Sequence, residues 1–172
     1  WPMDFIVIQG DIADQYADAL VSAGSSRLSM GGGAARALLE SAGDPLKDAA
    51  REQAPVDPGQ VAVTDAFDLH AEFVIHAVTL GRGGRSSEEI IRTATTNALQ
   101  AADDRDCHSL VLPALGAGVG DILTPESARY MAEAIDTFQP EVLADVRIIG
   151  HTPRSRWEIT EAVDKVRYTI SE

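Results

Sequence analysis

Two glycine-rich segments are the parts of this sequence best suited to binding phosphate. Residues 30–33 read Met-Gly-Gly-Gly and lead into an apolar-periodic stretch, and residues 116–120 read Gly-Ala-Gly-Val-Gly after an apolar run. A helix that begins in such a segment presents free backbone N–H groups and the positive end of its dipole. Glycine also lets an anion approach the backbone closely. Either segment alone could be a tight turn, but together they indicate two phosphates held at once.

The elements that must position these segments alternate between strand and helix along the chain. The sequence predicts strands at residues 5–9, 19–22, 61–67, 73–78, 109–114 and 146–149. It predicts helices at residues 33–41, 45–53, 87–102, 125–138 and 156–166. Most of the strand segments are nearly continuous apolar runs, as expected of strands buried on both faces. The order favours an α/β sandwich with helices on both sides of a sheet.

Proline and glycine mark where the expected helices begin and end. Asp44 and Thr124 each precede a proline, which predicts a capping side chain followed by proline at the first helical position. Gly43 is expected to end the preceding helix. Residues 81–87 are interpreted as a mobile, solvated loop before a capped helix, although the two arginines of the loop could contact an anion.

The composition describes an acidic globular protein. We expect a single domain over residues 1–172. The 27 acidic and 14 basic residues give a net charge of −13, so direct nucleic-acid binding is not expected. No apolar stretch approaches the roughly 20 residues needed to span a bilayer, and the start at Trp1 and Pro2 lacks a basic secretory flank. The single cysteine, Cys107, excludes an internal disulfide. These features favour a cytoplasmic protein without metal or cofactor.

An ordered set of motifs resembles the macro domain family over almost the whole chain. The motifs are Gln9-Gly10-Asp11-Ile12, the segment 19–26, the triple glycine, Val74-Ile75-His76-Ala77-Val78 and the segment 113–120. The resemblance implies a three-layer α/β/α sandwich with a mixed central sheet of about six strands. It also implies a cleft at one sheet edge that binds ADP-ribose, either free or attached to a partner molecule.

The resemblance assigns site residues to the two ends of this ligand. Asp11 would accept a hydrogen bond from the adenine amino group, with the backbone of Ile12 beside it and His151 in place of the family's stacking aromatic. Asp11 could equally cap the residues after it, and His151 could be a surface residue in a turn. His76 is expected in the core. The residues implied at the phosphates and ribose are Ser22, Ser25, Gly31, Gly32, Gly33, Gly116, Ala117, Gly118, Val119 and Gly120.

Three departures from the family pattern bear on activity. Ser22 and Ser25 stand where hydrolytic members carry asparagine, and Ala35 stands where they often carry aspartate. The aromatic residue that tends to cover the distal ribose is also missing, since Val119 and Gly120 occupy that region. The sequence therefore favours a binding module over a hydrolase of ADP-ribosyl esters or of ADP-ribose 1''-phosphate. Slow hydrolysis by a water held against the ligand phosphate stays open as the alternative.

A nucleotide-dependent enzyme of the Rossmann or P-loop kind is the third possibility, suggested only by glycine spacing. The segment 116–120 lacks the spacing of the dinucleotide fingerprint, and the chain has no GxxxxGK[ST] run. The sequence thus favours ADP-ribose over NAD or ATP as the ligand.

Overall fold

The computed structural model describes residues 3–171, with the backbone alone for Ile170 and Ser171. Trp1, Pro2 and Glu172 lie outside the described residues. The two ends of the domain expected over residues 1–172 therefore lie outside them too, as does part of the N-terminal segment on which no secretory signal was expected.

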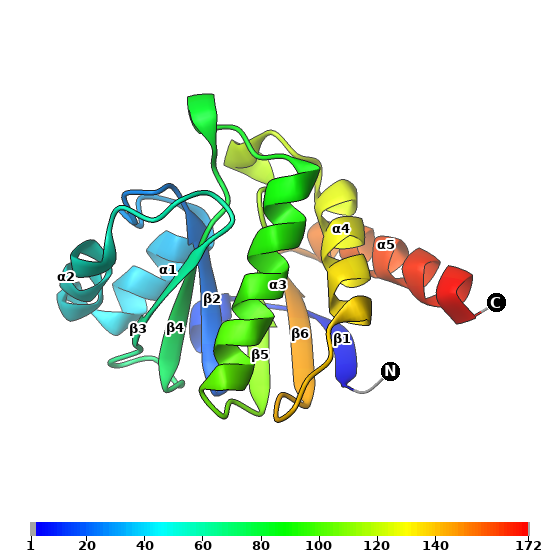
Figure 1. Cartoon of the computed structure of the whole chain (residues 1–172), viewed down its shortest axis with the longest axis horizontal. Coiled ribbons are helices and arrows are strands. Elements are labelled where there is room, and N and C mark those ends of the chain that lie inside the picture. The colour runs from blue at the N-terminus through cyan, green and yellow to red at the C-terminus, as the bar shows by residue number, and fades with distance from the viewer. Residues whose placement is uncertain (1–2, 172) are drawn as a thin grey trace.

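Six strands form one mixed sheet in the order β1-β6-β5-β2-β4-β3 (Figure 1). Four of the neighbouring pairs are parallel, and the pair of β3 with β4 is antiparallel. This confirms the mixed, six-stranded sheet that the family resemblance implied. The strands are β1 (Asp4–Gln9), β2 (Ala19–Gly24), β3 (Val61–Asp65), β4 (Phe73–Val78), β5 (Ser109–Leu112) and β6 (Asp145–Gly150).

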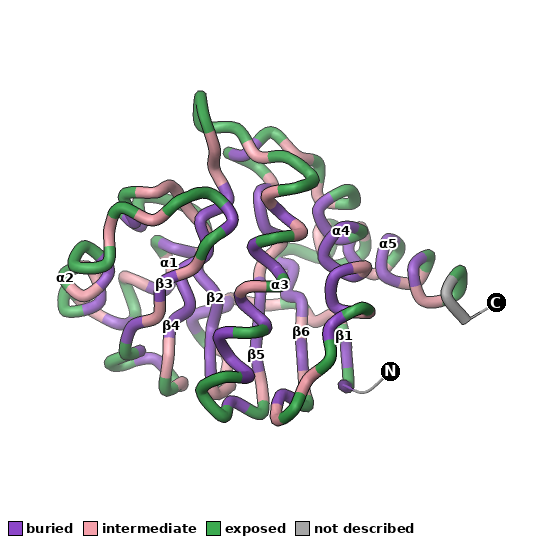
Figure 2. Tube along the Cα trace, in the orientation of Figure 1, coloured by how far each residue is buried: buried purple, intermediate pink, exposed green. Residues whose placement is uncertain are grey.

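Helices cover both faces of the sheet and complete three layers. One hydrophobic cluster joins the sheet to α1 (Gly33–Ala42) and α2 (Asp44–Gln53). A larger cluster joins the opposite face to α3 (Glu88–Asp104), α4 (Thr124–Thr137) and α5 (Pro153–Ser171). Figure 2 shows the central strands buried along most of their length between these layers. None of the described helices is both long and apolar enough to cross a membrane.

The parallel strands end at one edge of the sheet, and this edge positions the site. Leaving this edge, the chain passes through the loops that follow β1, β2, β4, β5 and β6. Ligands of open α/β sheets bind outside the carboxyl ends of the strands. Both glycine-rich segments begin near this edge, one after β2 and the other after β5.

Several strand boundaries differ from the sequence prediction for local reasons. Strand β3 ends at Asp65, short of the predicted Phe67, because Asp65 Oδ1 accepts the Phe67 N–H at 2.7 Å and Phe67 turns to a φ of 51°. Strand β5 ends at Leu112 because Pro113 has no N–H for the ladder. Strand β2 runs two residues beyond Ser22 because its pairing with β4 continues to Gly24.

The two predicted capping side chains were wrong, and each proline is the second helical residue instead of the first; the prediction that Gly43 ends α1 was right. Gly43, with a φ of 94°, both ends α1 and caps α2, so Asp44 becomes the first helical residue. Leu123 precedes α4 and leaves Thr124 within the helix. Neither helix has a side-chain cap. Ser87 does cap α3, because its Oγ accepts the Ile90 N–H at 3.2 Å.

Helix α5 begins at Pro153, three residues before the predicted start. Thr152 and Ser155 form a reciprocal cap: the Ser155 N–H donates to Thr152 Oγ1 at 3.1 Å, and the Thr152 N–H donates to Ser155 Oγ at 2.9 Å. The Thr-Pro pattern therefore marks a capped helix start here but not at Thr124.

Candidate ligand-binding site

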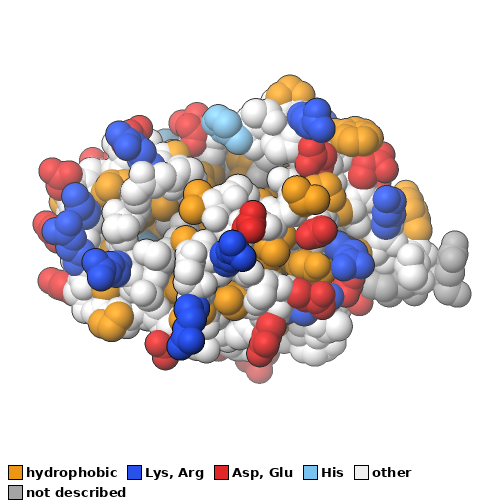
Figure 3. All heavy atoms as spheres, turned by 90° about the horizontal axis from the view of Figure 1, so that it is seen from above, with side chains coloured by type: hydrophobic (Ala, Val, Ile, Leu, Met, Phe, Trp, Pro, Cys, Tyr) orange, Lys and Arg blue, Asp and Glu red, His pale blue; other side chains and the backbone are white. Residues whose placement is uncertain are grey.

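Two adjoining cavities at the carboxyl edge of the sheet form one elongated cleft. Their volumes are about 390 and 300 Å³, and Gly33, Ala34, Pro113 and Ala114 line both. Figure 3 looks onto this edge and shows charged side chains of both signs around it, with hydrophobic side chains, backbone and other uncharged atoms between them. The shared lining places the start of α1 at the junction of the two cavities.

The larger cavity, which we call the Asp11 cavity, contains all three residues expected to contact adenine. Asp11 and Ile12 follow β1, and the exposed His151 follows β6, which is the neighbour of β1 in the sheet. Asp11 Oδ1 accepts the Ala13 N–H at 2.9 Å and caps the short helix η1 (Ile12–Asp14). Its other carboxylate oxygen accepts no hydrogen bond from the described residues, so the cap leaves one oxygen free for a ligand.

The wall of the Asp11 cavity depends on close backbone packing between β6 and α5. A Cβ on Gly150 would lie 2.5 Å from the backbone nitrogen of Arg156, so only glycine allows this approach. The contact brings Ser155 and the buried Ile159 of α5 against the cavity. The cavity therefore combines an apolar wall with one carboxylate and one imidazole, a surface suited to a flat heteroaromatic ring with a polar edge.

The smaller cavity, which we call the glycine cavity, is lined by Gly31, Gly32 and Gly33. A Cβ on any of the three would meet nothing within 4 Å, so the missing side chains leave open space in the cleft. Gly32 precedes α1 without a side-chain hydrogen bond, so the N–H groups of the first turn have no side-chain cap, and Gly33, Ala34 and Ala35 of this turn line the cavity. This end of α1 carries the partial positive charge of the helix dipole.

The second glycine segment forms the opposite lip of the glycine cavity and uses its glycines differently. A Cβ on Gly116 would lie 2.8 Å from Ser86 Oγ, and one on Gly120 would lie 3.0 Å from Ser86 Cβ. Packing against Ser86 leaves little room for a side chain at either position, and at Gly116 the φ of 75° also favours glycine. Ala117 and Val119 line the cavity beside them, and Val119 is strongly exposed.

Two of the predicted site residues lie outside the lining of the cleft. Ser22 is only 3% exposed and lies within β2, in register with His76 of β4. Gly118 lines a separate surface groove beside Trp157. Ser25, by contrast, lines the glycine cavity. The structure thus brings the other predicted residues together around one cleft.

His76 is a core residue, as expected. It is 2% exposed, and its Nε2 lies 2.9 Å from Thr64 Oγ1. Burial lowers the pKa of His76 to about 4, so the ring is neutral at pH 7.

Titratable groups are distributed unevenly along the cleft. Asp11 and His151 are the titratable residues lining the Asp11 cavity within the described chain, and the glycine cavity is lined by none. Ala35, which lines the glycine cavity, is 3% exposed and offers no polar atom beyond its backbone. The cleft can therefore bind an anion through backbone donors, but its glycine end lacks a side chain for acid–base chemistry.

Sequence reasoning missed most of the apolar lining. These residues lie at the ends of strands, in the loops after them, or on the first or second turn of α1, α4 and α5, so the carboxyl-edge rule was the signal that could have found them. The missed lining includes Ala34, Ala37, Thr124, Ile149, Gly150, Ser155 and Ile159 in the Asp11 cavity, and Ser29, Thr79 and Leu80 in the glycine cavity.

Comparison with known proteins gives a family match and several relatives. The family model described as Macro domain matches residues 21–131. A protein of Aquifex aeolicus is 37% identical over 166 residues, which are 95% of this chain and 98% of that protein. A protein of Mycobacterium tuberculosis is 38% identical over 145 residues, which are 84% of this chain. The chain spans 40% of that mycobacterial protein's length.

Solved macrodomain structures share the fold. A macrodomain of Oceanobacillus iheyensis with MES bound superimposes with a TM-score of 0.87 at 24% identity, covering 95% of this chain and 92% of that one. A mutant of the same macrodomain, solved with ADPR, gives a TM-score of 0.86 at 25% identity and covers 97% and 93% of the two chains. A Trypanosoma brucei macrodomain in complex with ADP-ribose gives 0.82 at 20% identity, covering 94% and 68%.

Proposed function

Because the chain belongs to the macro domain family, we propose that it binds ADP-ribose, free or as an ADP-ribosyl group on a partner molecule, in the cleft at the carboxyl edge of its sheet. The observation that carries this proposal is the meeting of the two cavities at the start of α1, which has no side-chain cap. A ligand with a diphosphate in its middle and a different group at each end matches that arrangement.

The adenine end belongs in the Asp11 cavity. The free carboxylate oxygen of Asp11 accepts a hydrogen bond from the adenine amino group, which only donates. The apolar wall of Ile12 and Ile159 covers the ring, and the exposed His151 stacks against it. A hydrogen bond to a charged group contributes about 1.5–3 kcal/mol, so Asp11 accounts for a large part of the preference for adenine.

The diphosphate and the distal ribose belong in the glycine cavity. The first-turn N–H groups of α1 donate to the diphosphate, and the open space above Gly31 and Gly32 admits it. The lip formed by Gly116 and Gly120 lies on the other side, with Ser25 lining the same cavity. Backbone amides and a helix end supply all of the positive potential in this arrangement.

The net charge of −13 is compatible with an anionic ligand. Charges farther away than the Debye length of about 8–10 Å are largely screened at physiological ionic strength. The backbone donors of the cleft act within hydrogen-bond distance of the phosphates, and no carboxylate of the described residues lines the glycine cavity. Local donors therefore determine the affinity, and the surface charge changes it little at high salt.

Binding without rapid turnover is the outcome that the glycine cavity supports. Its lining in the described chain contains no aspartate, glutamate or histidine that could act as a general base. Hydrolysis of an ADP-ribosyl ester or of ADP-ribose 1''-phosphate would depend on a water held against the ligand phosphate. That the ligand is carried by a partner molecule is likewise part of this proposal.

The test is a calorimetric titration of the protein with ADP-ribose, ADP and NAD in 0.1 M and in molar NaCl, conditions chosen because salt screens the acidic surface. The same sample is then assayed for release of ADP-ribose from a modified protein. The proposal predicts saturable binding in which ADP-ribose is preferred over NAD, without turnover above background. Tighter binding of NAD, or no binding at either salt concentration, would contradict it; binding with turnover would favour the hydrolase.

A further inference from the structure

We propose that Arg82 and Arg85 form a contact site for an acidic peptide segment that flanks an ADP-ribosylated residue. The proposal rests on the function proposed above. It concerns the acceptor, the partner chain to which the ADP-ribosyl group is attached, and not the ADP-ribosyl group itself. The two arginines lie in the loop of residues 81–86, between β4 and α3, which we call the arginine loop.

The arginine loop is fixed to the distal end of the cleft. Leu80, immediately before it, lines the glycine cavity. Ser86, at its other end, donates its N–H to the Gly120 carbonyl at 2.7 Å and packs against Gly116. The loop is closed by a Gly81 N–H bond to the Arg85 carbonyl, also at 2.7 Å. Both ends of the loop are thus attached to the cleft, where the acceptor of a bound ADP-ribosyl group would emerge.

The loop also extends beyond the body of the molecule. Figure 1 shows η2 (Arg82–Gly84) projecting past the carboxyl edge of the sheet, above the rest of the fold. Gly83 and Gly84 both have a φ of 75°, a conformation that suits glycine and lets the chain reverse at the tip. An acceptor chain leaving the glycine cavity would therefore pass beside the arginine side chains.

The two arginines have no charged partner among the described residues. Both are exposed, and neither makes an ion pair or a side-chain hydrogen bond with any residue in the range 3–169. Four other arginines, Arg36, Arg92, Arg147 and Arg154, pair with a carboxylate of this chain. Arg27, Arg51 and Arg156 also form no ion pair among the described residues, so Arg82 and Arg85 are distinguished by lying together on one short loop attached to the cleft.

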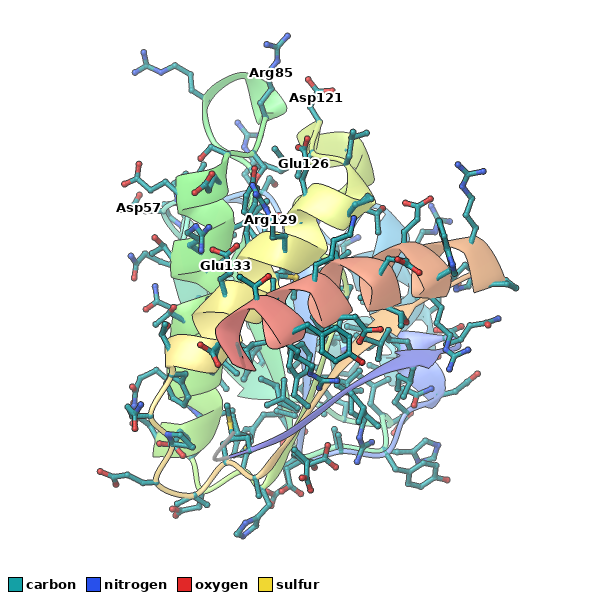
Figure 4. All side chains as sticks on the ribbon, turned by 90° about the vertical axis from the view of Figure 1, so that its right-hand side faces the viewer. Asp57, Arg85, Asp121, Glu126, Arg129 and Glu133 are labelled. Carbon is teal, nitrogen blue, oxygen red and sulfur yellow. The ribbon has the colours of Figure 1, made fainter. Side chains whose placement is uncertain are left out.

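The acids near the loop leave the arginines available. Arg85 and Asp121 project from neighbouring loops at the same end of the molecule (Figure 4), but they form no ion pair. Glu88 is paired with Arg92 at 3.0 Å. Glu89, in the first turn of α3, is exposed. These carboxylates would repel a long polyanion passing over the loop, whereas one or two carboxylates could still meet the arginines at its tip.

An acidic peptide fits this site better than a nucleic acid does. A nucleic acid strand presents one phosphate about every 3.4 Å, and its affinity depends on many cationic contacts. Two arginines on a surface with a net charge of −13 provide few such contacts. The planar guanidinium groups match one or two carboxylates in bidentate geometry, and a short peptide can present these without further charge.

The experiment compares peptides that carry one ADP-ribosylated serine flanked by glutamates or by glutamines. Wild type, the variant Arg82→Gln/Arg85→Gln and the control Lys47→Gln/Arg51→Gln are titrated with both peptides and with free ADP-ribose. The control removes two positive charges from α2, outside the lining of the cleft. At low salt, wild type should prefer the glutamate peptide by about 3- to 10-fold, the effect of two exposed ion pairs.

The preference should fall below about 2-fold in Arg82→Gln/Arg85→Gln and in molar salt, and persist in the control. Free ADP-ribose should bind all three proteins equally. Equal affinity of wild type for the two peptides, or a preference that survives the arginine substitutions, would overturn the proposal. So would tighter, arginine-dependent binding of an ADP-ribosylated oligonucleotide. Failure of wild type to bind free ADP-ribose would instead overturn the proposed function, and the acceptor site with it.

Discussion

Asp11 accepts the backbone N–H of Ala13 at 2.9 Å through Oδ1 and leaves its second carboxylate oxygen facing no donor of the described chain. One side chain can therefore cap η1 and bind a ligand at the same time. The two readings of Asp11 that the sequence left open are compatible, and a substitution that keeps the cap can separate them.

Asp11→Asn should weaken ADP-ribose binding while leaving the fold intact. Asparagine retains an oxygen for the Ala13 N–H but replaces the free carboxylate oxygen with a donor or a neutral acceptor. We expect a loss of about 1.5–3 kcal/mol, or roughly 10- to 150-fold in Kd, with an unchanged Tm. The control variant Asp14→Asn changes an exposed carboxylate, so its Kd by calorimetry and its Tm by thermal melting should match wild type. Equal Kd values for Asp11→Asn and wild type would remove Asp11 from the site.

Ala34→Glu should abolish binding by placing a negative charge where the two cavities meet. Ala34 lies in the first turn of α1, where an acidic residue favours the helix, so folding should be preserved. Ala34→Leu adds similar bulk without charge and should weaken binding less. Ser41→Glu adds the same charge at an exposed position near the other end of α1. If Ala34→Glu binds ADP-ribose like Ser41→Glu, the diphosphate does not pass over the start of α1.

Ser25→Asn/Ala35→Asp should increase the release of ADP-ribose from a modified protein. Both positions line the glycine cavity, and the substitutions introduce the residue types that the resemblance associates with hydrolytic members. Wild type should stay near background because its glycine cavity offers no titratable side chain within the described residues. Rapid release by wild type would show that an unassigned group performs the chemistry.

Stability should fall between pH 6.5 and about 4 partly because of His76. Burial lowers the pKa of His76 from 6.5 to about 4, so in this range the unfolded chain binds a proton that the folded chain does not. Stability therefore rises with pH through this window and is lost as the pH falls, by up to about 2–3 kcal/mol from this group. Denaturant unfolding of His76→Gln should show a flatter pH profile, whereas the exposed His108→Gln should follow wild type. An unchanged profile for His76→Gln would contradict this assignment.

Local patterns predicted the sheet and the two glycine segments well, because these depend on short-range features. The buried runs of β2 and β4 carry enough apolar residues to mark them without tertiary information. The predicted cap at Asp44 failed because of what precedes it in the chain. Only Gly43 separates α1 from α2, so the chain has no room for a separate capping residue at Asp44.

The site was predictable where residues follow a strand and was missed where two elements meet. Asp11 and His151 follow β1 and β6, and the family resemblance assigned both to the adenine end. The adjacency of β1 and β6 in the sheet comes from the structure, because no local pattern sets the strand order. Ile159 reaches the cleft because α5 packs against Gly150, a contact that no local pattern records. Ser22 lies inside the strand already predicted at residues 19–22, but its burial depends on the neighbouring strand. It is in register with His76 of β4 and only 3% exposed, and a pattern within one strand does not record this.

The measurement that tests the central claim most directly is a titration of the isotopically labelled protein with ADP-ribose, followed by backbone amide NMR shifts at low and molar salt. The account predicts the largest shifts at Ile12, at residues 31–35 and at residues 116–120, with saturation at a common Kd. The amides of α2 should stay unchanged. Shifts confined to another surface, or no shifts at either salt concentration, would contradict the proposed cleft.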